Sequence, residues 1–256
     1  MGAGARGRLR LGTRQGRLTV IEAVETAVEV VDLAATPLRE LNQRLHALAA
    51  GAPGPARWRI VNPNGAHAVA CGIDAEIEVE IEGHVGYYCA GMNKLATLRV
   101  HGNAGPGLAE NMVSGTVLVD GNASQSAGAT GHGGLLAIHG DAAARCGISM
   151  KGVDIVVRGS VGHLSAFMAQ TGRLVVCGDA GDGLGDSIYE ARLYVRGEVG
   201  GLGADCVEKE LRDHHVAEVR DLLERAGVDD VAPSEFRRYG SARRLYNFHL
   251  DHAGEY

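Results

Sequence analysis

The fold is decided by residues 173–185, which read RLVVCGDAGDGLG. The aliphatic residues Leu174 and Val176 stand four and two positions before Gly178, and Gly181 and Gly185 follow that glycine. Alternation with a period of two is typical of a short strand with one face in a core. The glycines predict a tight turn directly after the strand.

The same pattern recurs every 19 residues through the middle of the chain. Aliphatic residues stand two and four positions before each repeated glycine, and small residues stand two, three and seven positions after it. One such unit cannot bury its apolar face alone, but stacked coils can. The sequence therefore predicts an all-β fold, a single-stranded right-handed parallel β-helix of about seven 19-residue coils with flanking helices. Its corner glycines are Gly83, Gly102, Gly121, Gly140, Gly159, Gly178 and Gly197. Each is expected where a side chain would clash or where φ is positive.

The middle residue of each predicted strand points away from the core. These residues are Glu80, Arg99, Leu118, Ala137, Val156, Val175 and Tyr194, and the central ones are apolar. An apolar stripe on an outer face is usually covered. The cover is expected to be the chain's own C-terminal helix or a partner, with a tolerated aliphatic surface as the alternative.

The repeat divides the chain into four parts. Residues 1–17 form an Arg- and Gly-rich segment, expected to be a flexible tail, with an organelle transit peptide as the weaker alternative. Residues 18–66 are expected to be an α/β extension, with strand-like alternation at Val20 and Val24 and a helix that opens at Thr36-Pro37. The β-helix spans 67–204. Residues 205–256 are expected to hold a helix over 208–225 that caps the open end, followed by a docking arm.

The docking arm combines basic and aromatic residues, a composition enriched at protein interfaces. We expect partner contacts from Phe236, Arg237, Arg238, Tyr239, Arg243, Arg244, Tyr246 and Phe248. A tail packed on its own chain is an equally weighted alternative.

The composition argues against nucleic-acid-binding and membrane-spanning classes of protein. The 256 residues carry a net charge of −6, which argues against a nucleic-acid partner. No apolar run is long enough to cross a membrane. The five cysteines are odd in number and widely spaced, without a Cys-x-x-Cys pair. Reduced thiols and a cytoplasmic location are therefore expected.

Catalytic motifs are weak in this sequence. The glycine-rich stretches at 131–134 and 181–185 resemble phosphate loops, but both fall inside the repeat and neither opens a clear helix. His101 and His139 occupy equivalent outward positions without an evident third ligand. We therefore expect no catalytic, cofactor-binding or metal-binding residue on this chain.

The repeat resembles a known family. The motif Gly-x-x-Gly-x-x-x-Gly, intact at Gly178, Gly181 and Gly185, is similar to the C-terminal β-helix domain of the glutamate synthase large subunit over roughly residues 67–204. The segments 58–67 (WRIVNPNGAH) and 236–243 (FRRYGSAR) resemble the stand-alone β-helix subunit of N-methylglutamate synthase.

This resemblance implies a non-catalytic scaffold subunit that holds two catalytic partners together. The implied partners are an FMN-binding glutamate-synthase-like subunit and a class II glutamine-amidotransferase-like subunit, with FMN, and an iron–sulfur cluster as a second candidate, on the partners. The implied reaction converts methylamine and glutamate to N-methylglutamate and ammonia. The glycine repeat is shared with the β-helix subunit of formylmethanofuran dehydrogenase and that of the related formyltransferase–hydrolase complex, which is the first alternative. A carbohydrate-binding β-helix is the second.

Overall fold

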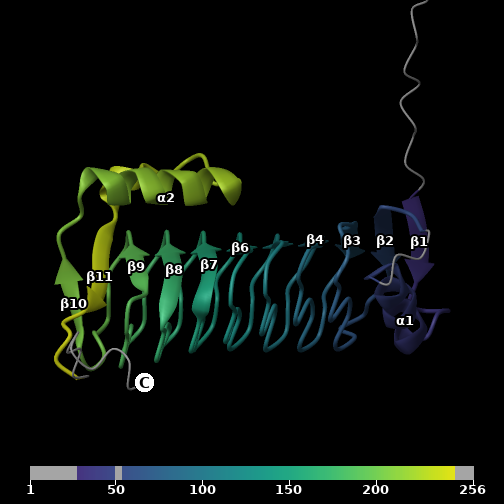
Figure 1. Ribbon diagram of the computed structural model, residues 1–256, viewed down its shortest axis with the longest axis horizontal. Coiled ribbons are helices and arrows are strands. Elements are labelled where there is room, and N and C mark those ends of the chain that lie inside the picture. Colours follow the sequence, from purple (N-terminus) through teal and green to yellow (C-terminus); the bar gives the residue numbers. More distant parts are fainter. Residues whose placement is uncertain (1–27, 50–53, 246–256) are drawn as a thin grey trace, which may run out of the picture.

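The computed structural model describes residues 28–49 and 54–245. The expected tail at 1–17, the strand signals at Val20 and Val24, and the docking candidates Tyr246 and Phe248 lie outside these ranges. The chain forms one 11-stranded sheet and two α-helices, and the sheet runs along a rod (Figure 1).

Nine strands follow one another in sequence order and pair in parallel, one strand per coil. They are β1 (Val28–Asp32), β2 (Arg57–Val61), β3 (Glu78–Glu82), β4 (Thr97–Val100), β5 (Thr116–Val119), β6 (Leu135–Ile138), β7 (Lys151–Val157), β8 (Thr171–Val176) and β9 (Arg192–Val195). From β3 to β9 the paired residues stand 19 positions apart, as Val117 pairs with Leu136, except at the start of β7, where the register shifts and Lys151 pairs with Thr171. A second line of parallel bridges joins Val85, Ala104, Ala123, Ala142, Val161, Ala180 and Val199. The predicted parallel β-helix is confirmed.

The inward aliphatic residues form a continuous core. Leu98, Val117, Leu136 and Leu174 have no exposed surface, and each lies directly over its counterpart in the next coil. The stack buries apolar surface that no single coil could bury, which is the main favourable contribution to folding.

The corner glycines are required by close contact between coils. The N–H of Gly121 donates to the carbonyl of Gly102 at 3.0 Å, and a Cβ on Gly121 would lie 2.7 Å from that oxygen. The same clash arises at the other corners from Gly102 to Gly197. Of the seven, Gly83 has a positive φ, of 133°. Steric exclusion therefore selects glycine at the remaining six corners.

Left-handed backbone occurs at three other positions of the six coils that begin at Gly83 through Gly178. Residues five, seven and nine after the corner glycine have φ between 52° and 74°; they include Tyr88, Gly107, Ser126, Arg145, Leu164 and Gly183 at the first position, Ala90, Ala109, Gly128, Gly147, Ala166 and Gly185 at the second, and Met92, Asn111, Thr130, Ser149, Met168 and Ser187 at the third. A non-glycine residue in this region costs about 1–2 kcal/mol. Stacking compensates this strain, coil after coil.

The N-terminal end of the core is closed by α1 (Leu38–Ala49), which follows the predicted Thr36-Pro37 opening. Leu41 and Leu45 are fully buried in the solenoid core. The Asn42 side chain donates to the carbonyl of Ala68 at 2.9 Å and accepts the N–H of Ala70 at 3.1 Å. These two bonds fix the helix against the first turn.

The C-terminal helix α2 (Asp213–Arg225) lies along the side of the rod, over β6–β9 (Figure 1). Val219, Leu222 and Leu223 on α2 pack against a cluster that includes Val156 and Val175 of the outward stripe. The expectation that the chain's own helix covers this stripe is confirmed. The expectation that the helix caps the open end is wrong, because its apolar face is occupied along the side.

The open end is closed by two short strands instead. β10 (Cys206–Lys209) is followed by α2, a 3-10 turn at Pro233–Glu235 and β11 (Arg237–Ser241). β11 returns to lie between β9 and β10 and is antiparallel to both. The last parallel coil therefore does not present a free parallel edge.

Candidate partner interface

Most of the expected docking arm is part of the chain's own fold. Phe236 and Tyr239 are buried, with 3% and 2% of their surface exposed. These two side chains are therefore not available to a partner, and the self-packed alternative describes them. Sequence could not show this, because β11 pairs with strands far from it in the chain.

The arginines of the arm also bind the chain itself. Arg237 donates to the carbonyl of Gly197 at 2.7 Å, and Arg238 donates to the carbonyl of Glu210 at 2.9 Å. Arg243 pairs with Glu190 at 2.8 Å, and both side chains are more than half exposed. The side chains of Arg243 and Arg244 remain on the surface, at the basic end of the arm.

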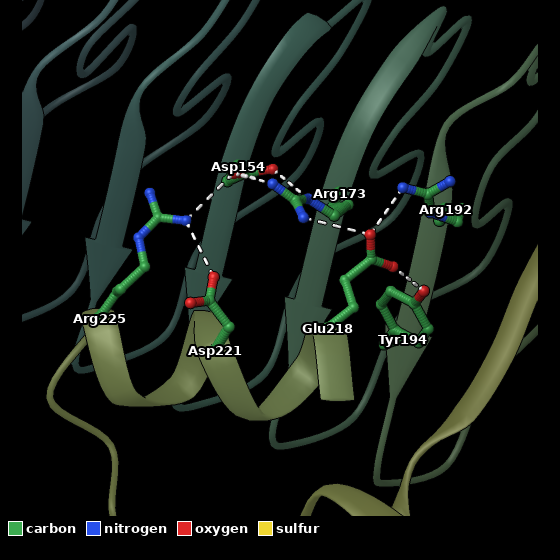
Figure 2. Close-up of polar contacts among 7 residues, drawn as sticks. All are labelled: Asp154, Arg173, Arg192, Tyr194, Glu218, Asp221 and Arg225. Atoms are coloured by element: carbon green, nitrogen blue, oxygen red, sulfur yellow. Dashed lines mark hydrogen bonds and ion pairs between the residues drawn. The ribbon is translucent and has the colours of Figure 1, made fainter. Parts of the chain in front are cut away.

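A network of ion pairs fixes α2 to the solenoid (Figure 2). Arg173 on β8 holds both carboxylate oxygens of Asp154 on β7, at 2.6 and 2.5 Å. Its remaining nitrogen donates to Glu218 on α2 at 3.2 Å. Glu218 also accepts from Arg192 at 2.6 Å and from the Tyr194 hydroxyl. Two charged residues of adjacent coils are thus neutralised by one helix.

The surroundings of these groups shift their pKa values. Burial raises the pKa of Glu218, but the hydrogen bond from Tyr194 and the charge of Arg192 outweigh it, so the pKa is lowered overall. Burial and the bond to Glu218 raise the pKa of Tyr194. Glu218 is therefore a carboxylate and Tyr194 a neutral donor at neutral pH. Both side chains are used in the contacts that hold α2 on the solenoid.

A signal for this network was present in the sequence and was missed. Asp154, Arg173 and Arg192 stand 19 residues apart, each two positions before an apolar residue of the outward stripe. Asp154 and Arg173 are opposite charges at one repeat position of two adjacent coils, so the register places them side by side. The partner Glu218 lies outside the repeat and carries no such signal.

The outer face of β2–β5 lies beyond the end of α2 and is not covered by it (Figure 1). Its charged side chains pair with each other at half-exposed positions: Arg57 with Glu78 at 2.9 Å, and Arg59 with Glu82 at 3.2 Å. Such exposed pairs contribute only about 0–1 kcal/mol each. They can exchange partners at little cost, so this face is available for docking.

His101 and His139 both lie near the carboxylate of Asp120. His101 contacts Asp120 at 2.7 Å through Nδ1 and Glu80 through Nε2, while His139 Nδ1 lies 3.9 Å from Asp120. Burial lowers the pKa of His101, but the two carboxylates outweigh it and raise the pKa overall. In the described ranges, no group of three or more His, Cys, Asp or Glu side chains is placed to hold a metal ion.

The cysteines and the glycine loops have structural surroundings. Burial raises the pKa of Cys89, Cys146 and Cys206 to about 12, so these thiols are protonated and poor nucleophiles at neutral pH. Within the loop at 131–134, a Cβ on Gly133 would lie 2.7 Å from the carbonyl of Val113 in the preceding coil. Stacking therefore explains this glycine without a phosphate. None of the helices in the described chain is both long and apolar enough to cross a membrane.

Comparison with known proteins gives one informative result. No family model matches the sequence, and no solved structure matches it. The chain is 62% identical over 227 residues to Protein GlxC of Rhizobium meliloti (strain 1021), which covers 89% of this chain and 99% of that protein. The 227 aligned residues are more than the repeats at 67–204 contain. The similarity therefore extends into the flanking segments that build α1, α2 or β11.

Proposed function

The chain belongs to the family of Protein GlxC, and from this premise we propose that it is a non-catalytic structural subunit of a glutamate-synthase-like complex. The proposal rests on the observation that the clustered polar side chains of this chain make contacts within the chain. The acid–base residues that cluster, Asp154, Glu218 and Asp120, bind arginine or histidine partners that fix α2 and neighbouring coils. Such an arrangement stabilises a rod, because these acidic groups hold α2 and neighbouring coils in place.

The more specific proposal is the scaffold of an N-methylglutamate synthase. Such an enzyme exchanges the amino group of glutamate for methylamine and releases ammonia. An amidotransferase-like subunit and an FMN-binding subunit would supply the chemistry, and this chain would hold them in register. The segments 58–67 and 236–243 support this proposal by their resemblance to that subunit type. We place the complex in the cytoplasm, in keeping with the reduced cysteines.

The partners would use surfaces that the chain leaves open. The outer face of β2–β5 offers exchangeable ion pairs, and the basic end of the arm offers Arg243 and Arg244. These surfaces lie toward opposite ends of the rod (Figure 1). Two subunits bound there would be held apart at a fixed distance, which suits a scaffold.

The test is purification of the native complex through a tag on this chain. We expect an amidotransferase-like and a flavin-containing subunit to co-purify, identified by mass spectrometry, with FMN released on denaturation. The chain expressed alone should show no absorption near 450 nm. Stoichiometric FMN on the isolated chain would overturn the scaffold proposal. Co-purification with formyltransferase and amidohydrolase subunits would support the first alternative instead.

A further inference from the structure

A small pocket opens at the C-terminal end of the sheet, beside the start of α2. It measures about 160 Å³ and is lined by residues 189–192, by Lys209 of β10, by His215 of α2, and by Arg238, Gly240, Ser241 and Arg243 of β11 and the turn after it. Three strands and a helix contribute to it, because β11 returns between β9 and β10. The pocket exists only in the folded end of the rod.

Two cations face each other across this part of the sheet. Lys209 and Arg238 are register partners in the antiparallel pair β10–β11, and both are half-buried. Like charges directly opposite one another destabilise a sheet. Arg238 is also the register partner of Tyr194 on β9, so Arg192 is its diagonal neighbour. Lys209 and Arg238 thus place two positive charges side by side, near Arg192, whose charge Glu218 balances, and their repulsion favours an anion between them.

The carboxylates nearby make their ion pairs with other cations, although the charge of Arg238 contributes to the lowered pKa of Glu210. Glu190 pairs with Arg243 at 2.8 Å, Glu218 with Arg192 at 2.6 Å, and Glu210 with Arg212 at 2.8 Å. Arg238 donates to a neutral acceptor, the carbonyl of Glu210, at 2.9 Å. Within the described chain, the ammonium group of Lys209 makes no hydrogen bond or ion pair. The charges of Lys209 and Arg238 therefore remain available to a ligand.

The lowered pKa of His215 agrees with a positively charged pocket. Burial lowers the pKa of His215, and the charge of Arg238 lowers it further. Its Nδ1 accepts the backbone N–H of Arg212 at 3.1 Å, so the ring is held in place. A neutral imidazole at the wall adds no repulsion of its own and can donate a hydrogen bond from its other nitrogen.

We propose that this pocket binds a small dianion, of the size of phosphate or a four-carbon dicarboxylate, between Lys209 and Arg238. Arginine binds carboxylate and phosphate oxygens through two parallel hydrogen bonds, and lysine adds a compact charge. The volume is below the roughly 300–1,000 Å³ of sites for cofactors and drug-sized ligands, which disfavours a flavin or a nucleotide. Phosphate and a dicarboxylate share the chemistry that the pocket recognises.

Binding is tested on the full chain by calorimetric titration with phosphate, succinate and chloride at constant ionic strength. We expect saturable binding of phosphate, succinate or both, and none of chloride; the dianion that binds identifies the source. Lys209→Gln and Arg238→Gln should each weaken binding by at least about 10-fold, since each removes a charge-assisted contact. Lys151→Gln is the matched control, because Lys151 is an exposed lysine on β7 away from the pocket. It should leave binding within about 2-fold.

Thermal melts separate this role from a structural one. Without ligand, Lys209→Gln should melt at a higher temperature than the wild type, because it removes the repulsion from Arg238. With phosphate or succinate, the wild type and Lys151→Gln should shift upward while Lys209→Gln does not. Absence of saturable binding by either dianion overturns the proposal. So does equal weakening by Lys209→Gln and Lys151→Gln.

Discussion

Tyr194 on β9 donates its phenolic hydrogen to the carboxylate of Glu218 on α2, so an aromatic side chain that points out of the solenoid is fully buried. The same carboxylate receives Arg192 and Arg173. One residue of the helix therefore satisfies three donors from two adjacent coils. The position of α2 along the rod depends on this residue more than on any other polar contact of the helix.

Glu218→Ala should destabilise the protein by about 2–4 kcal/mol, because it leaves Arg192 and the buried Tyr194 hydroxyl without this acceptor and removes one of the two carboxylates that hold Arg173. The measurement is urea unfolding followed by circular dichroism. Asp221→Ala is the control on the same helix; its pair with Arg225 is 60% exposed on the aspartate side, and its loss should cost less than about 0.5 kcal/mol. Equal costs for the two variants would contradict the role assigned to Glu218.

Glu218 should also make stability depend on pH. Because its pKa is lower in the folded protein than in the unfolded chain, its contribution is present above the unfolded pKa of about 4.5 and is lost as pH falls through the folded pKa. Unfolding free energies measured from pH 6 down to pH 3 should therefore fall more steeply in the wild type than in Glu218→Gln. Parallel profiles in the two proteins would show that Glu218 does not titrate with folding.

Gly140→Ala should destabilise by about 1–3 kcal/mol, since the added Cβ would lie 2.1 Å from Asn122 Oδ1 and 2.8 Å from the backbone of Gly121. Gly240→Ala is the matched control in β11, where a Cβ would meet nothing closer than the carbonyl of Ala191 at 3.7 Å. That variant should be neutral or slightly stabilising. Denaturant midpoints of the two variants check the comparison. A harmless Gly140→Ala would mean that the coils can separate to admit a side chain.

Arg145→Gly should stabilise the protein by about 0.5–1 kcal/mol. Arg145 is exposed and has φ of 61°, a conformation that Gly107 and Gly183 adopt at the equivalent position of other coils. Relief of left-handed strain exceeds the greater entropy of glycine in the unfolded chain. Arg145→Ala removes the same side chain but keeps the strain, so it serves as the control. Glycine melting below alanine at this position would contradict the explanation.

Two truncations separate folding from docking. Deleting residues 246–256 leaves β11 complete and should leave the melting temperature unchanged while weakening co-purification with the catalytic partners. Deleting residues 234–256 removes β11 and the buried Phe236 and Tyr239, and should lower the melting temperature as well. If the shorter deletion co-purifies at full stoichiometry, the docking role of Tyr246 and Phe248 is wrong.

The solenoid could be predicted from sequence because each coil repeats the same pattern of aliphatic residues and glycines. Gly140 follows Ile138 as Gly121 follows Val119, and the 19-residue register gives the pairing of the central strands, such as Val117 with Leu136. The left-handed positions were not recognised, because Arg145, Leu164 and Met168 occupy them beside glycines and the side chains give no common signal. The place of β11 was also hidden, since an antiparallel strand between β9 and β10 depends on contacts distant in sequence.

The closure of both ends has a consequence for the length of the rod. Because α1 packs on the core at one end and the antiparallel strands β11 and β10 end the parallel stack at the other, the chain itself sets how many coils there are. Each coil adds about 4.8 Å along the axis. The length of the rod is therefore fixed in steps of one coil. Removing one 19-residue unit between Gly83 and Gly102, away from the strands that α2 covers, should shorten the spacing of anything bound near the two ends by about 4.8 Å.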